Sequence, residues 1–253
     1  MVERLHDTQE VLGSIPHGRT MFKPKIIYDD KNFLALNKPS GLLVHSTKIS
    51  KELTLVDWLL KHYPDVKNVG DEPKIRPGIV HRLDRDTSGV ILVARNQKYF
   101  EYLKNLFQNR QIKKTYLALV YGEIKSKIGT IEKPISLKPG SVKRTIWKGK
   151  MEKEAITEYK LVKFLKGFSL VRVYPKTGRT HQIRIHLASI GHPIVGDNLY
   201  GPKINPLGLN RLFLHAESLE FPVSEGRKIK IEAELPEELK EILDILDGLK
   251  NKD

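Results

Sequence analysis

Residues 81–89, HRLDRDTSG, concentrate side chains that could do chemistry in nine positions: two carboxylates, two guanidinium groups, an imidazole and two hydroxyls. A carboxylate such as that of Asp84 can act as a nucleophile, and a pair of carboxylates can instead hold a divalent metal ion. The alternative is a solvated turn in which the aspartates pair with Arg82 and Arg85, because exposed ion pairs are common and weak. The loop alone leaves all three interpretations open.

The segment that follows this loop, VILVA at 90–94, predicts the element that must position it. Five consecutive apolar residues between Gly89 and a polar pair are typical of a strand that is buried on both faces. A loop carried by such a rigid strand holds its side chains precisely, which favours a functional role. We therefore expect Asp84 to stand at the mouth of a core strand.

Composition and charge narrow the class of partner. The net charge is +14, and residues 104–153 alone carry thirteen Lys or Arg against three Glu. Such a concentration of positive charge favours a polyanionic partner, above all nucleic acid, with a merely solubilising surface as the alternative. The chain has no cysteine, which excludes disulfides, zinc knuckles and every thiolate nucleophile.

Targeting signals are not evident in the sequence. No apolar run approaches the roughly 18 residues needed to cross a bilayer, and the first residues lack the basic start and apolar core of a signal peptide. We expect a cytoplasmic protein without a membrane partner. Residues 1–21 are polar and have no strong periodicity, so we expect them to be an N-terminal extension.

Hydrophobic periodicity predicts more strands than helices. Helices are expected at 54–60 with Thr54 as N-cap, at 97–110, at 180–190 with Thr180 as N-cap and Gly191 as stop, and at 236–249. Strands are expected at 25–28, 33–37, 90–94, 115–121, 155–165, 168–174, 213–216, 219–221 and 228–233. Short turns join many of them, which predicts an α+β fold with a central mixed, mainly antiparallel sheet flanked by helices.

Two further side chains lie in positions that could serve chemistry. Tyr116 falls within a predicted strand, where a tyrosine usually packs in the core with its hydroxyl at the rim. Arg184 falls on a short predicted helix, where its stem could simply cover apolar surface. His181 and His186 are five residues apart and do not share a helix face well, which argues against a zinc pair.

Three blocks of sequence carry a resemblance to a known family. They are NKPSGLLVH at 37–45, HRLDRDTSG at 81–89 and TGRTHQIRIHLASIGHPIVGDNLYG at 177–201. Together they resemble the RluA-type family of RNA pseudouridine synthases, over about residues 25–235. The resemblance implies isomerisation of selected uridines in ribosomal or transfer RNA to pseudouridine, without cofactor or metal. It also implies one catalytic domain, at 22–253, with a basic RNA-binding cleft. Many relatives carry a small accessory RNA-binding module before this domain, and because residues 1–21 are too few to form it we expect this sequence to depart from them by lacking it.

The resemblance also implies roles for individual residues. Asp84 matches the catalytic aspartate, Tyr116 the active-site tyrosine, and Arg184 an arginine paired to the aspartate. Arg82 matches a residue that lies at the flipped nucleotide in relatives. The other residues expected to contact RNA are Lys38, Lys113, Lys114, Arg179, His181 and Gln182.

These roles are chemically sensible for a reaction in which uracil leaves its ribose, turns and rejoins through a ring carbon. The base must leave the helical stack, which costs a few kcal/mol. Asp84 must be ionised to act as a nucleophile, and an adjacent arginine favours the charged form. Attack on the ring and attack on the anomeric carbon both remain open. Tyr116 could act as a base or only as an orienting partner, because a tyrosine pKa near 10 suits a base poorly at neutral pH.

Two rival functions differ in kind from this one. The first is a metal-dependent RNA nuclease that uses Asp84 and Asp86, with Asp197 as its third carboxylate. The second is a non-catalytic RNA-binding or assembly protein. The sequence identifies neither the RNA nor the uridine, and a monomer is the simplest oligomeric state.

Overall fold

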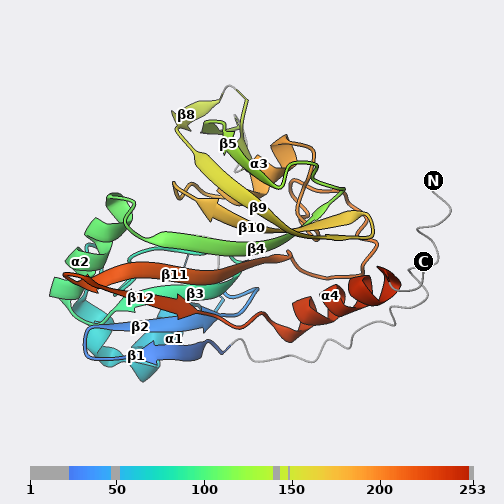
Figure 1. The fold of residues 1–253 in the computed structure, drawn as a ribbon. Coiled ribbons are helices and arrows are strands. Elements are labelled where there is room, and N and C mark those ends of the chain that lie inside the picture. The colour runs from blue at the N-terminus through green and yellow to red at the C-terminus, as the bar shows by residue number, and fades with distance from the viewer. Residues whose placement is uncertain (1–22, 47–51, 139–142, 148, 251–253) are drawn as a thin grey trace. The chain divides into compact units, whose positions relative to one another are not determined.

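The computed structural model describes residues 23–46, 52–138, 143–147 and 149–250, and the chain divides into two compact units (Figure 1). We call the first the aspartate unit; it consists of Phe22–Tyr116 and His215–Leu235. We call the second the arginine unit; within the described residues it consists of Leu117–Leu214 and the segment from Pro236 onward. The expected extension at 1–21 lies outside the described residues, and one catalytic domain at 22–253 stays a prediction.

The sheet of the aspartate unit carries the HRLDRDTSG loop. Its strands are β1 (Lys25–Asp29), β2 (Phe33–Lys38), β3 (Ser88–Ala94), β11 (Leu214–Ser224) and β12 (Arg227–Glu232). They run in the order β1-β2-β3-β11, with β12 paired to β11. Only the β3–β11 pairing is parallel among these. The predicted mixed, mainly antiparallel sheet is confirmed.

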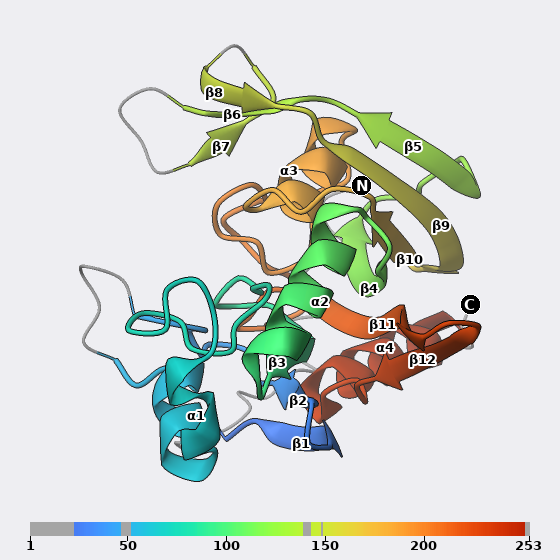
Figure 2. The same cartoon turned by 90° about the vertical axis from the view of Figure 1, so that its left-hand side faces the viewer.

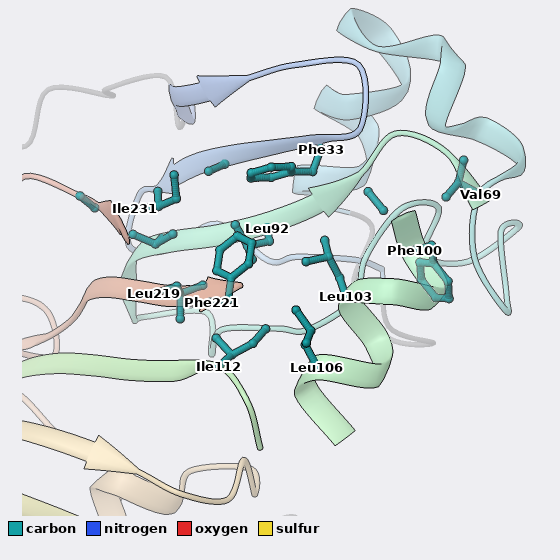
Figure 3. Packing of buried hydrophobic residues seen from close by; sticks show 14 residues of the cluster. Phe33, Val69, Leu92, Phe100, Leu103, Leu106, Ile112, Leu219, Phe221 and Ile231 are labelled. Carbon is teal, nitrogen blue, oxygen red and sulfur yellow. The ribbon is translucent and has the colours of Figure 1, made fainter. Parts of the chain in front are cut away.

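Every residue of β3 is buried, as its uninterrupted apolar sequence predicts. Because successive side chains of a strand point to opposite faces, Val90 and Leu92 pack with α2 (Gln97–Gln108), and Ile91 and Val93 pack with α1 (Leu55–His62). Figure 3 shows Leu103 and Leu106 pointing from α2 toward the β3 side. Two helices thus fix the strand that follows Asp84 from both faces.

The start of α1 shows why its boundary could be predicted. Thr54 accepts a hydrogen bond from the backbone N–H of Asp57, and the Asp57 carboxylate accepts one from the backbone N–H of Thr54. This capping box satisfies two backbone donors that would otherwise lack partners. A short 3₁₀ helix, η2 (Pro64–Asn68), follows α1.

The arginine unit contains a larger and a smaller sheet. In the larger one, β4 (Lys113–Tyr121), which enters from the aspartate unit, precedes β10 (Phe168–Pro175), β9 (Ile156–Leu165) and β5 (Ile128–Glu132) in spatial order. The smaller sheet consists of β6 (Ile135–Leu137), β7 (Arg144–Thr145) and β8 (Lys150–Lys153), and Figure 2 shows it at the end of the β5 and β9 strands. The helices are α3 (Gln182–Ser189) and α4 (Glu237–Lys250).

The predicted N-cap of α3 is wrong. The capping position is His181, which adopts a left-handed backbone conformation with φ 58° and makes no side-chain cap. The predicted stop is confirmed, since Gly191 follows the helix at φ 86°. The strands expected at 213–216 and 219–221 form one continuous strand, β11. No helix in the described ranges is long and apolar enough to cross a membrane.

Candidate active site

Asp84 is held in a tight turn at the amino end of β3. Its carbonyl oxygen accepts a hydrogen bond from the backbone N–H of Thr87 at 3.2 Å, which closes a four-residue turn with Arg85 and Asp86 exposed at its corners. Leu83 and Thr87 are buried on either side, and Asp84 itself is half-buried. The turn therefore fixes the Asp84 backbone between two buried anchors.

Residues of the NKPSG segment hold this turn in place by hydrogen bonds. The Lys38 ammonium donates to the carbonyl oxygens of Pro39, Leu42 and Arg85 at 2.8, 2.8 and 3.0 Å. Gly41 N–H donates to the Arg85 carbonyl at 2.9 Å, and the Ser40 hydroxyl donates to the Asp86 carbonyl at 2.8 Å. Lys38 is 0% exposed, so its ammonium is not accessible to RNA in this structure, and its contact with RNA stays a prediction. Lys38 is a structural cation that organises the Asp84 turn.

Replacing Lys38 with methionine tests that role. Lys38→Met keeps the length of the side chain but leaves buried carbonyl oxygens without their donor, so we expect about 3 kcal/mol of lost stability. Urea unfolding measures it. Lys31→Met, at an exposed position in the turn between β1 and β2, is the matched control and should change stability by less than about 0.5 kcal/mol. Equal effects of the two variants would contradict the clamp.

His81 anchors the loop at its other end. Its Nε2 accepts a hydrogen bond from the backbone N–H of Leu92 at 2.9 Å, and its ring stacks on Phe107 of α2 with centroids 4.5 Å apart. Burial, assisted by the nearby charge of Lys114, lowers the pKa of His81 to about 3. His81 is therefore neutral at physiological pH and serves as a structural acceptor.

This neutral histidine makes stability depend on pH. Between the unfolded pKa of 6.5 and the folded pKa of about 3, only the unfolded chain binds the proton. The stabilisation by neutral His81 is complete above about pH 6.5 and decreases as the pH falls. At pH 5 about 2 kcal/mol of it has been lost. In urea titrations, we expect wild type to lose more stability than His81→Gln between pH 7.5 and pH 5, by that amount. The prediction fails if His81→Gln and the exposed-site control His62→Gln lose the same stability over this range.

Tyr116 lies next to Asp84 in the aspartate unit. The half-buried ring packs against the cluster that includes Leu36, Leu83 and Ala216. Burial raises the pKa of the Tyr116 phenol, and the negative charge of Asp84 raises it further. The phenol thus keeps its proton at neutral pH, which favours an orienting or stacking role over that of a general base.

Gly89 lets the two parallel strands meet directly behind the loop. It pairs with Ala216 of β11 at φ 115°, and a Cβ there would lie 2.2 Å from the Ala216 carbonyl oxygen. Beside it, the Ser88 hydroxyl lies 2.9 Å from His215 Nδ1. Only glycine fits this close approach in a left-handed conformation.

Arg184, in the arginine unit, forms a buried ion pair with Asp197. Its Nε and Nη2 donate to the two carboxylate oxygens of Asp197 at 2.8 and 2.7 Å, and both side chains are almost fully buried. Burial alone would raise the pKa of Asp197, but the hydrogen bonds and charge of Arg184 keep it below its ordinary value. The backbone N–H groups of Leu199 and Tyr200 also donate to this carboxylate. Asp197 thus fixes the orientation of the guanidinium.

Tyr200 extends this arrangement to the small sheet. The Arg184 guanidinium carbon lies 5.3 Å from the centre of the Tyr200 ring, within the range of a cation–π interaction. Tyr200 Oη accepts a hydrogen bond from the backbone N–H of Arg144 at 3.1 Å and lies 3.0 Å from His181 Nδ1. His181 is half-buried, and its ring nitrogen lies within hydrogen-bond distance of the Tyr200 hydroxyl.

Gln182 makes its hydrogen bonds within the arginine unit. Its carbonyl oxygen accepts from the Thr177 hydroxyl and the Arg179 N–H, and its amide nitrogen donates to Ile156 O and Thr157 Oγ1. The side chain is 4% exposed, so it is not accessible to RNA in this structure, and its contact with RNA stays a prediction. Gln182 instead ties the start of α3 to β9.

The remaining predicted RNA contacts are accessible to different degrees. Arg82 and Lys113 are exposed, whereas Lys114 and Arg179 are half-buried. Arg82 lies close to His45, since its charge adds to burial in lowering the pKa of that histidine. Arg179 donates from Nε to the Glu154 carbonyl at 3.0 Å. RNA binding by these four residues stays a prediction.

The geometry weakens the nuclease interpretation. Asp197, its third carboxylate, is occupied by Arg184 and two backbone N–H groups. Within the part of the chain that the structure describes, no three His, Cys, Asp or Glu side chains converge to hold a metal ion.

Each unit therefore holds some of the predicted site residues. The aspartate unit brings Asp84 and Tyr116 together; the arginine unit holds Arg184 with Arg179, His181 and Gln182. The pairing of Arg184 with Asp84 stays a prediction. Sequence reasoning missed Asp197 and Tyr200 as partners of Arg184. The GDNLYG segment contained a signal for the turn that holds Asp197, because an Asp side chain commonly accepts hydrogen bonds from backbone N–H groups that follow it in a turn.

Comparisons with known proteins agree with the sequence blocks. The family model described as RNA pseudouridylate synthase matches residues 32–189. A ribosomal large subunit pseudouridine synthase D of Borreliella burgdorferi is 40% identical over 83% of this chain, and one of Pseudomonas aeruginosa is 36% identical over 88%. The solved structure of human RNA Pseudouridylate Synthase Domain Containing 1 superposes with a TM-score of 0.71 at 27% identity, over 90% of each chain. The matched region spans 65% of the Borreliella protein and 71% of the Pseudomonas protein.

Proposed function

This chain belongs to the RNA pseudouridylate synthase family, and we propose that it isomerises specific uridines in ribosomal or transfer RNA to pseudouridine. In this reaction the bond from N1 of uracil to C1′ of the ribose breaks, and a bond from C5 to C1′ forms. The hydrogen on C5 leaves as a proton and N1 gains a proton, so the product has the same atoms as the substrate. No oxidant or reductant is needed.

The observation that carries this proposal is the construction around Asp84. A carboxylate stands on a turn that is clamped by a buried lysine and anchored by a neutral histidine, beside a protonated tyrosine. Such rigidity suits a nucleophile that must meet a flipped base in a fixed geometry. Asp84 supplies the nucleophile in this account, Tyr116 stacks on or orients the uracil, and Arg184 provides positive charge for the reacting groups.

Tritium release tests this function. RNA from cells that lack the gene, labelled with tritium at C5 of uridine, is incubated with the protein in the presence of a chelator. We expect release of tritium into water while the RNA keeps its length. Shortened RNA and loss of activity in chelator would instead indicate the nuclease. Absence of both reactions, with RNA still bound, would indicate the non-catalytic RNA-binding protein.

A further inference from the structure

The small sheet of the arginine unit presents an unusual surface. We propose that β6, β7 and β8 form a docking surface for RNA, on which an unpaired nucleobase stacks on Trp147 while nearby lysines contact the phosphates. This inference rests on the proposed function, because it identifies how the RNA substrate would be held.

The first observation is the exposure of Trp147. Its side chain is 76% exposed, although a tryptophan normally buries much of its large apolar area. The residue before it, Ile146, packs against the cluster formed by Ile135, Ala155 and Ile185. Trp147 N–H also donates to Thr145 Oγ1 at 3.1 Å. The backbone is thus anchored while the ring is left in solvent, which suits a platform for stacking.

The second observation is the charge of the same sheet. The described residues of 135–153 include five cations and one acid, Glu152. Lys138, Lys150 and Lys153 are exposed, and they make no ion pair in the described part of the chain. An exposed indole and lysines without ion pairs, carried by one small sheet and its connections, combine an apolar platform with attraction for phosphate, as in proteins that bind single-stranded nucleic acid. An acidic protein could form ion pairs with the lysines, but it would not explain the exposed ring of Trp147.

The third observation is the connection of this surface to the arginine. Arg144 of β7 donates its backbone N–H to Tyr200 Oη, and the Tyr200 ring lies against the Arg184 guanidinium. Cluster residue Ile185 is the neighbour of Arg184 on α3. RNA seated on the small sheet therefore binds to the same compact unit that positions Arg184.

Fluorescence of Trp147 tests the surface directly. The chain has two tryptophans, so a Trp58→Phe background leaves Trp147 as the only one, and Asp84→Asn stops turnover during the measurement. The probes are an RNA hairpin with an unpaired uridine-containing loop, a fully paired RNA duplex of equal length, and polyglutamate. We expect the hairpin to quench Trp147 emission, and the duplex to bind without comparable quenching. Quenching of equal size by polyglutamate, or none by saturating hairpin, would overturn the proposal.

Affinity provides the second readout. Trp147→Ala should weaken hairpin binding by about 5- to 100-fold and leave duplex binding unchanged, while Trp147→Phe should retain much of the hairpin affinity. Replacing Lys138, Lys150 and Lys153 together by glutamine should lower the slope of log affinity against log salt by about 2. If Trp147→Ala binds the hairpin as wild type does, the surface is wrong even when pseudouridine still forms. If quenching occurs but no pseudouridine forms with the wild-type chain, the surface stands and the proposed function falls.

Discussion

Asp84→Asn is expected to reduce the rate of tritium release from C5-labelled RNA by roughly 10³-fold or more. The substitution keeps the size and shape of the side chain but removes the negative charge that makes it a nucleophile. The turn that holds it should survive, because its hydrogen bonds to Thr87, Gly41 and Lys38 are made by backbone carbonyls of Asp84 and Arg85. Affinity for RNA should change little, so the loss should appear in kcat.

Asp86→Asn is the matched control for this prediction. Asp86 lies two residues away in the same turn and is exposed, so its replacement removes an equal charge from the same loop. We expect activity within about threefold of wild type, since exposed charges contribute little. Retained tritium release in Asp84→Asn, or an equal loss in both variants, would show that the carboxylate of Asp84 is not the nucleophile.

Arg184→Met is expected to abolish turnover and to destabilise the fold. It leaves Asp197 buried without its ion-pair partner, which typically costs about 3–5 kcal/mol. RNA affinity should fall only modestly if Arg184 acts on the reacting groups. Equal loss of affinity and turnover would instead make Arg184 a phosphate contact. Urea unfolding, filter binding and tritium release measure the three effects on one sample.

A paired substitution separates stability from catalysis. In Arg184→Met combined with Asp197→Leu, both charges are replaced by apolar groups, so much of the lost stability should return. Turnover should not return, because no guanidinium is present. Recovery of turnover in the double variant would show that Arg184 acts only by holding the fold together.

Local patterns predicted much of the fold. The uninterrupted run VILVA indicated a strand covered on both faces, and β3 is buried throughout. Thr54 indicated the start of α1, and both hydrogen bonds of its capping box with Asp57 are present. These predictions succeeded because each depends on residues only a few positions apart.

The environment of the site depended on contacts between distant segments. Lys38 was expected to contact RNA, yet its ammonium is buried and donates to the carbonyl of Arg85, 47 residues later in the chain. Asp197 was considered only as a metal ligand, because its pairing with Arg184 follows from the path of the 192–201 loop. Thr180 was expected to cap α3, but the left-handed backbone of His181 places the helix start one residue later. Such arrangements depend on tertiary structure that local periodicity does not encode.

The nucleoside composition of treated RNA tests the central claim most directly. After incubation with the wild-type chain in chelator, the RNA is digested to nucleosides, which chromatography and mass spectrometry then separate and identify. We predict that uridine decreases and a nucleoside of identical mass, pseudouridine, increases by the same amount, and that Asp84→Asn produces none. An unchanged uridine content with wild-type protein bound to its RNA, or pseudouridine formed equally by Asp84→Asn, would contradict the account.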